Sequence, residues 1–260
     1  MVLEPEVGRL AGGDEGAGRL PEPEVIVTMV QRILEGYRGI LSGRRVLVSA
    51  GGTHEAIDPV RVVTNRSSGH QGHALAEVAA RLGAHVTLVS TATREVALDV
   101  RRVIRVIHVE SAAQMARAMF DNFASCDVAI MAAAVADFTF DAAPKKLKKE
   151  KGLPVLSPVA TPDIVSELAA RRTRGQFVVA FAAETEDLEA RAIDKLERKG
   201  VDLVVANDVS QPLTGFASPT NEVLLISRGP EVERISLRSK EGISEKILTK
   251  VASLFNQGVA

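Results

Sequence analysis

Apolar residues follow two patterns along this chain. Short continuous apolar runs predict buried β-strands, and longer stretches with an apolar residue every three or four positions predict amphipathic helices. From residue 44 onward the two kinds alternate. The expected strands are 46–49, 85–90, 103–109, 127–131, 177–181 and 203–206, and the expected helices are 72–82, 112–123, 163–171 and 187–199.

This alternation predicts βαβ units and a mostly parallel sheet covered by helices on both faces. After Asn207 the pattern changes to two strands, 221–227 and 231–236, joined by Arg228-Gly229-Pro230, and a last helix over 243–255. The expected fold is therefore α/β: a doubly wound, Rossmann-like sheet with a C-terminal β-hairpin extension. Ser111 is the expected N-cap of the helix at 112–123, and Thr161 that of the helix at 163–171.

The first 40 residues differ from the rest. Residues 1–24 are dominated by Gly, Pro and Glu with little to bury, which predicts a flexible tail or linker. Residues 25–40 predict a lead-in helix whose apolar face includes Ile26, Val30 and Ile33. Residues 41–260 then form the single folded domain.

Composition narrows the class of protein. The formal net charge of −1 gives no electrostatic reason to expect nucleic acid or a membrane surface as partner. The single cysteine, Cys126, cannot form an internal disulfide and is typical of a reducing compartment, and no apolar run is long enough for a membrane span. We therefore expect a cytoplasmic protein. The five histidines are scattered without metal-ligand spacing, and neither a Walker A loop nor a G-x-S-x-G motif is present.

The loops after the expected strands meet at one edge of a parallel sheet, where ligands bind. The loop from Asn65 to Gly72 is polar, contains glycine and precedes a helix, so its backbone N–H groups suit a phosphate. A simple turn explains this loop about equally well. Gly51 and Gly52 follow the first strand, and they too fit either a phosphate site or a simple turn. Arg61 stands four residues before Asn65, and its planar guanidinium suits a carboxylate or a phosphate.

Other clusters follow later strands. An alanine run with Ala133 and Ala134 ends a buried strand and leaves room for a ligand against the backbone, with Asp137 at its rim. Five lysines lie within residues 145–151; such a run is usually a solvated loop, but here it fits a cationic lid over a triphosphate. Lys195 and Lys199 lie four apart on one helix, either solvated or sharing a phosphate.

Taken together, these clusters closely resemble one family in order and spacing. The motifs are SAGGTHEAIDPVR, TNRSSGHQG, MAAAVADF, PKKLKK, TPDI, VAFAAET, KLERKGVDLVVANDVS and GFASPTNEV. Over roughly residues 40–256 the chain resembles phosphopantothenate–cysteine ligase, the synthetase of coenzyme A biosynthesis, which is often fused behind a decarboxylase. The segment from Gly8 to Ile26 is similar to the end of that decarboxylase half. Gly12 stands where the family has a cysteine, so no decarboxylase activity is expected.

The resemblance implies CTP-dependent ligation of 4′-phosphopantothenate and L-cysteine through an acyl-cytidylate, with Mg²⁺ present and pyrophosphate and CMP released. It implies catalytic roles for Asn65, Arg61 and Lys146, with Asn65 at the acyl-cytidylate, Arg61 on the pantothenate side and Lys146 on the nucleotide. Substrate-binding residues would be Arg61, Asn65, Ala133, Ala134 and Asp137. The nucleotide site would comprise Gly51, Gly52, Ser67, Ser68, Gly69, Ala133, Asp137, Lys146, Thr161, Pro162, Asp163, Ile164, Phe181, Lys195 and Lys199. The metal ligands stay unassigned.

The resemblance also implies a homodimer whose pantothenate pocket borrows from the neighbouring subunit, with the edge strands near 207–236 as the expected interface and a decarboxylase half as a further partner. Two alternatives on the same fold are a nicotinamide-dependent reductase and a module that binds a nucleotide without turnover. The reductase predicts a G-x-G-x-x-G loop, which the chain lacks. Replacing Lys146 separates a ligase from a pure binder.

Overall fold

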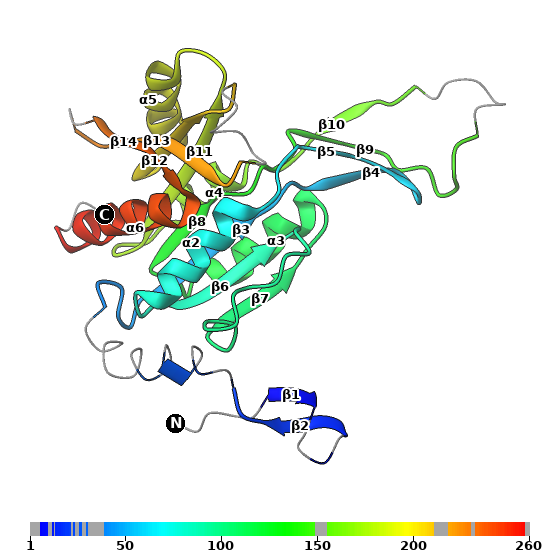
Figure 1. The fold of residues 1–260 in the computed structure, drawn as a ribbon. Helices are drawn as coiled ribbons and strands as arrows, with labels where there is room; N and C mark the ends of the chain where they lie inside the picture. Colours follow the sequence, from blue (N-terminus) through cyan, green and yellow to red (C-terminus); the bar gives the residue numbers. More distant parts are fainter. Residues whose placement is uncertain are drawn as a thin grey trace.

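The computed structural model describes residues 6–9, 12, 14–21, 23, 26–27, 30, 39–148, 155–210, 218–229 and 232–257. Its centre is an eight-stranded sheet of order β14-β13-β12-β11-β8-β3-β6-β7 (Figure 1). The strands from β7 to β12 in this order are parallel, and β13 and β14 are antiparallel. Their bounds are β3 Arg45–Ala50, β6 His85–Ser90, β7 Ile104–His108, β8 Val128–Met131, β11 Phe177–Glu184, β12 Leu203–Asp208, β13 Thr220–Ser227 and β14 Val232–Ser239.

Helices cover both faces of this sheet, which confirms the predicted fold class. Helices α2 (His70–Arg81) and α6 (Lys240–Asn256) pack on one face with Val46 and Val48 of β3. On the other face Leu47 packs in a second core with α3 (Ala112–Phe123), α4 (Ile164–Arg171) and α5 (Leu188–Lys199). Alternate side chains of one buried strand therefore enter two separate cores, as the period of two in a strand requires.

The order in which the chain lays down its strands creates a switch point. From β3 the chain passes through α2 to β6 and β7, and then returns through α3 to β8 on the opposite side of β3. Crossovers on either side of β3 and β8 thus run in opposite directions, and the loops beyond their carboxyl ends diverge. In open α/β sheets this divergence leaves the crevice in which ligands bind.

Four short strands outside the sheet were not predicted. The pairs β4 (His54–Asp58) with β5 (Arg61–Thr64) and β9 (Phe138–Phe140) with β10 (Pro158–Ala160) are antiparallel. Figure 1 shows them extending together from the sheet, and we call residues 54–64, 138–148 and 155–160 the arm. Apolar side chains are exposed here, including Val60 at 62% and Val159 at 56%. The side chains that these segments bury include the carboxylates Glu55 and Asp58, so the segments lack the apolar run by which the main strands are recognised.

Residues 6–9 and 15–19, within the expected tail, pair as β1 (Glu6–Arg9) and β2 (Glu15–Arg19). That residues 1–24 form a flexible tail or linker stays a prediction. One expected helix cap needs correction. The side chain of Asp163, not of Thr161, caps α4 by accepting from the Ser166 N–H at 3.1 Å. Most of the expected lead-in helix at 25–40 lies outside the described residues. Ser111 caps α3 as predicted, in a capping box with Gln114.

Cys126 follows α3 and is buried. Burial, reinforced by the neighbouring Asp127 charge, raises the pKa of its thiol to about 12. The thiol is therefore protonated at neutral pH and is a poor nucleophile. Among the helices that the structure describes, none is both long enough and apolar enough to cross a membrane.

Candidate functional site

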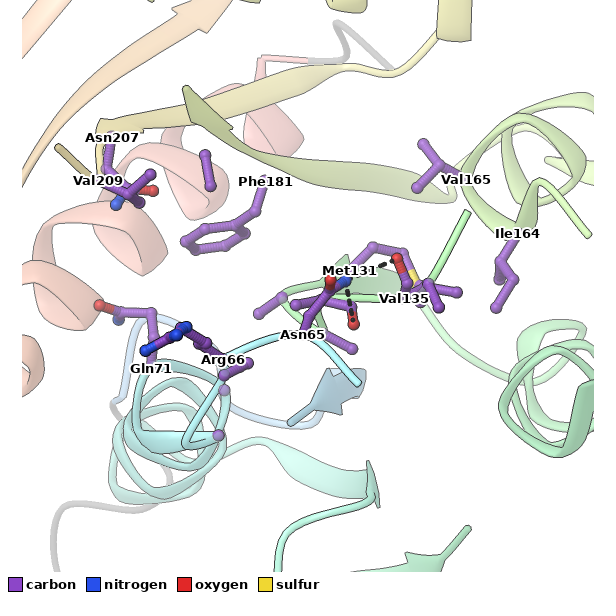
Figure 2. Close-up of a pocket in the computed structure, with 18 of the residues that line it drawn as sticks. Asn65, Arg66, Gln71, Met131, Val135, Ile164, Val165, Phe181, Asn207 and Val209 are labelled. Carbon is purple, nitrogen blue, oxygen red and sulfur yellow. Dashed lines mark hydrogen bonds between the residues drawn. The ribbon is translucent and has the colours of Figure 1, made fainter. Parts of the chain in front are cut away.

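A cavity of about 730 Å³ opens at the carboxyl edge of the sheet, where the switch point predicts it. The loops after β5, β8, β12 and before α4 contribute to its wall, together with the end of β11. Figure 2 shows Asn207, Val209 and Gln71 at one end and Ile164 and Val165 at the other. The wall includes these predicted residues: Asn65, Ser67, Ser68, Gly69, Ala133, Ala134, Asp137, Thr161, Pro162, Asp163, Ile164, Phe181, Lys195 and Lys199.

The amino end of α2 faces this cavity and is built for an anion. Gly69 is the N-cap, with a left-handed φ of 75°, and a Cβ there would lie 2.8 Å from the Cβ of Ala92. Glycine is therefore required by both conformation and space. As glycine it places no side chain over the first turn, and that turn contains no acidic residue. The N–H groups and the positive end of the helix dipole thus remain available to a ligand.

Asn65 and the alanine loop form the middle of the cavity. The Asn65 amide donates to the carbonyls of Ala134 at 3.2 Å and Val135 at 3.3 Å, as the dashed lines in Figure 2 show. Two buried hydroxyls hold the same loop: Ser49 Oγ accepts from the Ala133 N–H at 3.1 Å, and Thr53 Oγ1 accepts from the Ala136 N–H at 2.9 Å. The small side chains and fixed backbone leave a surface on which a ligand can lie.

The two predicted lysines of α5 both reach the cavity, but each has a protein partner. Lys195 Nζ donates to the Phe181 carbonyl at 2.6 Å, and burial lowers the pKa of this amine. Lys199 pairs with Asp163. Burial raises the pKa of Asp163, but hydrogen bonds from Lys199 and Ser166 outweigh that effect and leave the pKa below its usual value. The carboxylate is thus charged at neutral pH and fixes Lys199 at the wall.

Arg61 and Lys146 are not among the residues that line the cavity; both lie on the arm. The Arg61 guanidinium pairs with the buried Asp58 carboxylate and also donates to the Leu147 carbonyl at 2.9 Å. Asp58 Oδ2 in turn accepts from the Leu147 N–H at 3.0 Å. The bonds from Arg61, opposed by burial, hold the pKa of Asp58 well below its usual range. This clamp fixes the residue directly after Lys146, whose own side chain is exposed.

Gly51 and Gly52 also do not line the cavity. Gly51 has a φ of 90°, and a Cβ on it would come within 2.1 Å of Thr91 Oγ1. A Cβ on Gly52 would lie 2.7 Å from the Asn65 carbonyl oxygen. These glycines let the loops after β3, β5 and β6 approach one another, so in this structure they support the wall from outside. Their proposed contact with the nucleotide stays a prediction.

Several lining residues were not assigned to the site individually. Arg66, His70, Gln71 and Gly72 lie in the 65–72 loop that was predicted as a phosphate site. The others are Met131, Ala132, Val135, Ala136, Val165, Ala183, Asn207, Val209, Asn221 and Lys240. Most are sequence neighbours of predicted residues, and Asn207 and Val209 lie at the carboxyl end of β12, so the edge rule could have included them. Asn221 and Lys240 come from the antiparallel end of the sheet and from α6. No local motif indicates that these two reach the same cavity.

Among the described residues, no group of three or more His, Cys, Asp or Glu side chains could hold a metal ion. Asp137 and Asp163 are the carboxylates among the residues lining the cavity, and Asp163 is bound to Lys199. Magnesium in nucleotide sites is commonly held by one or two carboxylates plus substrate phosphates. Asp137 is thus the lining carboxylate that could serve such a metal, and the metal ligands stay unassigned.

The fold and the cavity define a doubly wound α/β domain with a large, partly polar cavity at its switch point. A family model described as the DNA/pantothenate metabolism flavoprotein C-terminal domain matches residues 41–255, and the chain belongs to this family. The coenzyme A biosynthesis bifunctional protein CoaBC of Bacillus subtilis (strain 168) is 42% identical over 261 residues. That match covers 98% of this chain and 63% of the relative, so the chain spans less than two thirds of its length.

Two further relatives match nearly the same part of this chain. A protein of an unknown prokaryotic organism, named cysteine/cysteine sulfinic acid decarboxylase, is 41% identical over 97% of this chain and 71% of its own length. The crystal structure of the C-terminal domain of a coenzyme A biosynthesis bifunctional protein CoaBC superposes with a TM-score of 0.71 at 34% identity. It covers 84% of this chain and 99% of the solved chain. The folded domain is therefore the counterpart of that C-terminal domain.

Proposed function

We propose that this chain is a CTP-dependent ligase that joins 4′-phosphopantothenate and L-cysteine to 4′-phosphopantothenoylcysteine in coenzyme A biosynthesis. The observation that carries the proposal is the convergence, in one cavity, of the uncapped α2 amino end, Asn65, the alanine loop and two lysines. These are the groups that the motifs of this ligase family supply. The relatives named CoaBC support the pathway, and the match to their C-terminal part supports the ligase over a decarboxylase.

The chemistry requires activation of a carboxylate. Its oxygen attacks the α-phosphorus of CTP, the bond to the bridging oxygen breaks, and pyrophosphate leaves with that electron pair. The cysteine amine then attacks the acyl carbon and CMP leaves. The protein positions the reactants and stabilises charge rather than supplying a covalent group. Asn65 would contact the acyl-cytidylate beside Ala133 and Ala134, and Thr161–Ile164 with Phe181 would hold the cytidine.

Magnesium would shield the triphosphate charge, and the Asp137 carboxylate in the cavity wall would be available to hold it. Lys195 and Lys199 would line the nucleotide region on the α5 side. Lys146 would neutralise charge on the nucleotide when the lysine segment of the arm reaches the cavity, and Arg61 would act on the pantothenate side. Since both lie on the arm outside the cavity of their own chain, the proposal requires either movement of the arm or the arm of a second copy.

A homodimer is part of this proposal, and the arm is the surface that supports it best. Val60, Val62, Phe138, Val155 and Val159 are 44–93% exposed on the arm. Exposed apolar patches of this kind mark association surfaces. The edge strands near 207–236 carry fewer such side chains among the described residues, with Val232 at 38%. We therefore place the proposed contact on the arm, and the edge strands are the location to test against it.

Pyrophosphate release with 4′-phosphopantothenate and Mg²⁺ tests the function. CTP and ATP are compared, each with and without cysteine. The proposal expects CTP-dependent release that increases with cysteine, is lost in Lys146→Gln and persists in the control Lys148→Gln, which changes the same charge two residues away. Tight nucleotide binding without release would contradict a ligase and favour the non-catalytic module. The reductase alternative is not favoured, since the β3–α2 connection lacks G-x-G-x-x-G.

A further inference from the structure

The turn directly after β6 lies outside the set of residues that line the cavity, and it has no assigned role. Its central residue, Thr91, is partly buried, and the Thr91 N–H donates to the Ala50 carbonyl at 3.1 Å. Ser90 Oγ accepts from the Ala92 N–H at 3.0 Å and lies 3.1 Å from Nε2 of the buried His73. The backbone of Thr91 is therefore fixed by bonds at Thr91 itself and at both of its neighbours.

The Thr91 hydroxyl occupies the space that the missing side chain of Gly51 leaves open. It donates to the Gly52 carbonyl at 2.7 Å, a distance typical of a well-formed O–H···O bond. A Cβ on Gly51 would lie 2.1 Å from the same hydroxyl oxygen, so a side chain at that position would displace the hydroxyl. Thr91 therefore fixes the position of the two glycines that follow β3.

The two glycines contact both parts of the cavity wall that involve Asn65. A Cβ on Gly52 would lie 2.7 Å from the Asn65 carbonyl oxygen, so these two backbones are in direct contact. Gly52 also forms an isolated bridge with Ala134, whose N–H donates to the Gly51 carbonyl at 2.8 Å. The Ala134 carbonyl in turn accepts from the Asn65 side-chain amide (Figure 2). The same two glycines thus locate the backbone of Asn65 and the acceptor of its side chain.

We propose that Thr91 is a positioning residue for Asn65. Its hydroxyl, acting through Gly51 and Gly52, fixes the orientation in which the Asn65 amide meets the acyl-cytidylate. This inference rests on the proposed function, in which Asn65 contacts that intermediate. Thr91 itself touches no reactant and transfers no proton. Its effect on rate comes from the geometry of Asn65, because a displacement of about 1 Å at a reacting centre can cost up to roughly 10²-fold in turnover.

Thr91→Val tests this role, because valine keeps the branched shape of threonine and removes the hydroxyl. Turnover should fall by about tenfold and the acyl-cytidylate should accumulate in rapid-quench experiments, while the KM for CTP changes by less than about twofold. Thr91→Ser restores the hydroxyl and should recover most of the wild-type turnover. Thr93→Val makes the same change on an exposed side chain two residues away and should behave as wild type.

A double-mutant cycle shows whether Thr91 acts through Asn65. Two residues that act through one group give losses that do not add. In the Asn65→Ala background, Thr91→Val should therefore cost less than about a further twofold in turnover. Additive losses would overturn the proposal, and so would a lower thermal midpoint in Thr91→Val with wild-type turnover. If Thr91→Val did not fold, as judged by circular dichroism, Thr91→Ala would carry the same cycle.

The ligase and the positioning role fail in different ways. Absence of pyrophosphate release by the wild-type chain would overturn the ligase, but the position of Asn65 could still be measured by NMR. Its side-chain amide signals, identified by their loss in Asn65→Ala, should shift in Thr91→Val and not in Thr93→Val. Normal release by the wild-type chain, with unchanged turnover and unchanged Asn65 signals in Thr91→Val, would overturn the positioning role and leave the ligase standing.

Discussion

The cavity and the arm divide the predicted catalytic residues between two unlike regions. In the cavity, Asn65 donates to an alanine loop that two buried hydroxyls hold, and closely packed glycines support its own loop. On the arm, Arg61 and Lys146 lie among exposed apolar side chains, and one clamp centred on Asp58 anchors the lysine segment. In the proposed reaction, fixed groups of the cavity would bind the nucleotide, while a separate, outlying element would carry the groups that neutralise developing charge.

The largest expected effect is in the cavity. Asn65→Ala removes the amide that bridges Ala134 and Val135 and would contact the intermediate. Loss of one well-placed polar group at a reacting centre lowers turnover by about 10²–10³-fold. CTP affinity, measured by calorimetry, should change little, and the acyl-cytidylate should accumulate in rapid-quench experiments. Normal turnover would show that the cavity needs no amide at this position.

Acid sensitivity is expected in the scaffold behind the cavity. Burial, together with the charges of Arg94, His70 and His108, lowers the pKa of His73 to about 4, and its Nε2 lies 3.1 Å from Ser90 Oγ. Between pH 6.5 and 4 the unfolded state binds the proton more readily. The contribution of His73 to the free energy of unfolding is therefore complete above pH 6.5. About 3 kcal/mol of it is lost as the pH drops to 4.

Urea denaturation at a series of pH values measures this slope. His73→Asn should flatten it, and His85→Asn, on an exposed histidine at the opposite end of the sheet, should not. An unchanged slope in His73→Asn would assign the acid sensitivity to another group.

The next effect tests the arm. Asp58→Asn removes the charge that holds Arg61 and weakens the anchor of Leu147. Misplacement of Lys146 by about 1 Å can cost up to roughly 10²-fold in turnover, and we expect a loss of about tenfold or more. Trypsin cleavage at Lys145, Lys146 and Lys148 should accelerate, with the thermal midpoint of the central domain preserved. Asp141→Asn, on an exposed arm carboxylate, is the control; equal cleavage in both variants would contradict the clamp.

The smallest effect on the monomer is expected at the arm surface. Val62 is 44% exposed, so Val62→Ser should change the free energy of unfolding by less than about 0.5 kcal/mol. Sedimentation velocity should nevertheless show dissociation of the proposed dimer. Val232→Ser makes the same change on β14 and should leave assembly intact. Dissociation in that variant alone would return the interface to the edge strands near 207–236.

The same division explains what sequence could predict. The inner strands of the main sheet are apolar on both faces, and its strands were placed within a few residues, with β6 and α3 matching their predicted bounds. Buried apolar runs and capping boxes are local in the sequence, so they can be recognised without knowledge of the tertiary structure. Ser67 to Gly69 and Ala133 to Asp137 could be assigned to one site because parallel strands bring their carboxyl ends together.

What was missed depends on contacts between distant segments. The arm strands carry no apolar run, because their apolar side chains face outward. Lys240 reaches the cavity through the packing of α6 on α2, which no spacing in the sequence records. Lys146 follows a strand end, as expected, but the next residue, Leu147, bonds to Asp58 across 89 residues and holds the segment on the arm. The position of Lys146 after a strand end therefore did not place its side chain at the cavity.

Cys126 has a consequence for an enzyme that would take free cysteine as a substrate. Such an enzyme meets cystine and mixed disulfides whenever its surroundings become oxidising, and exchange begins with attack by a thiolate. With its pKa at about 12 and its sulfur enclosed between α3 and β8, Cys126 offers almost no thiolate. A ligase of the proposed kind would then bind cysteine without its own thiol entering that substrate's redox chemistry.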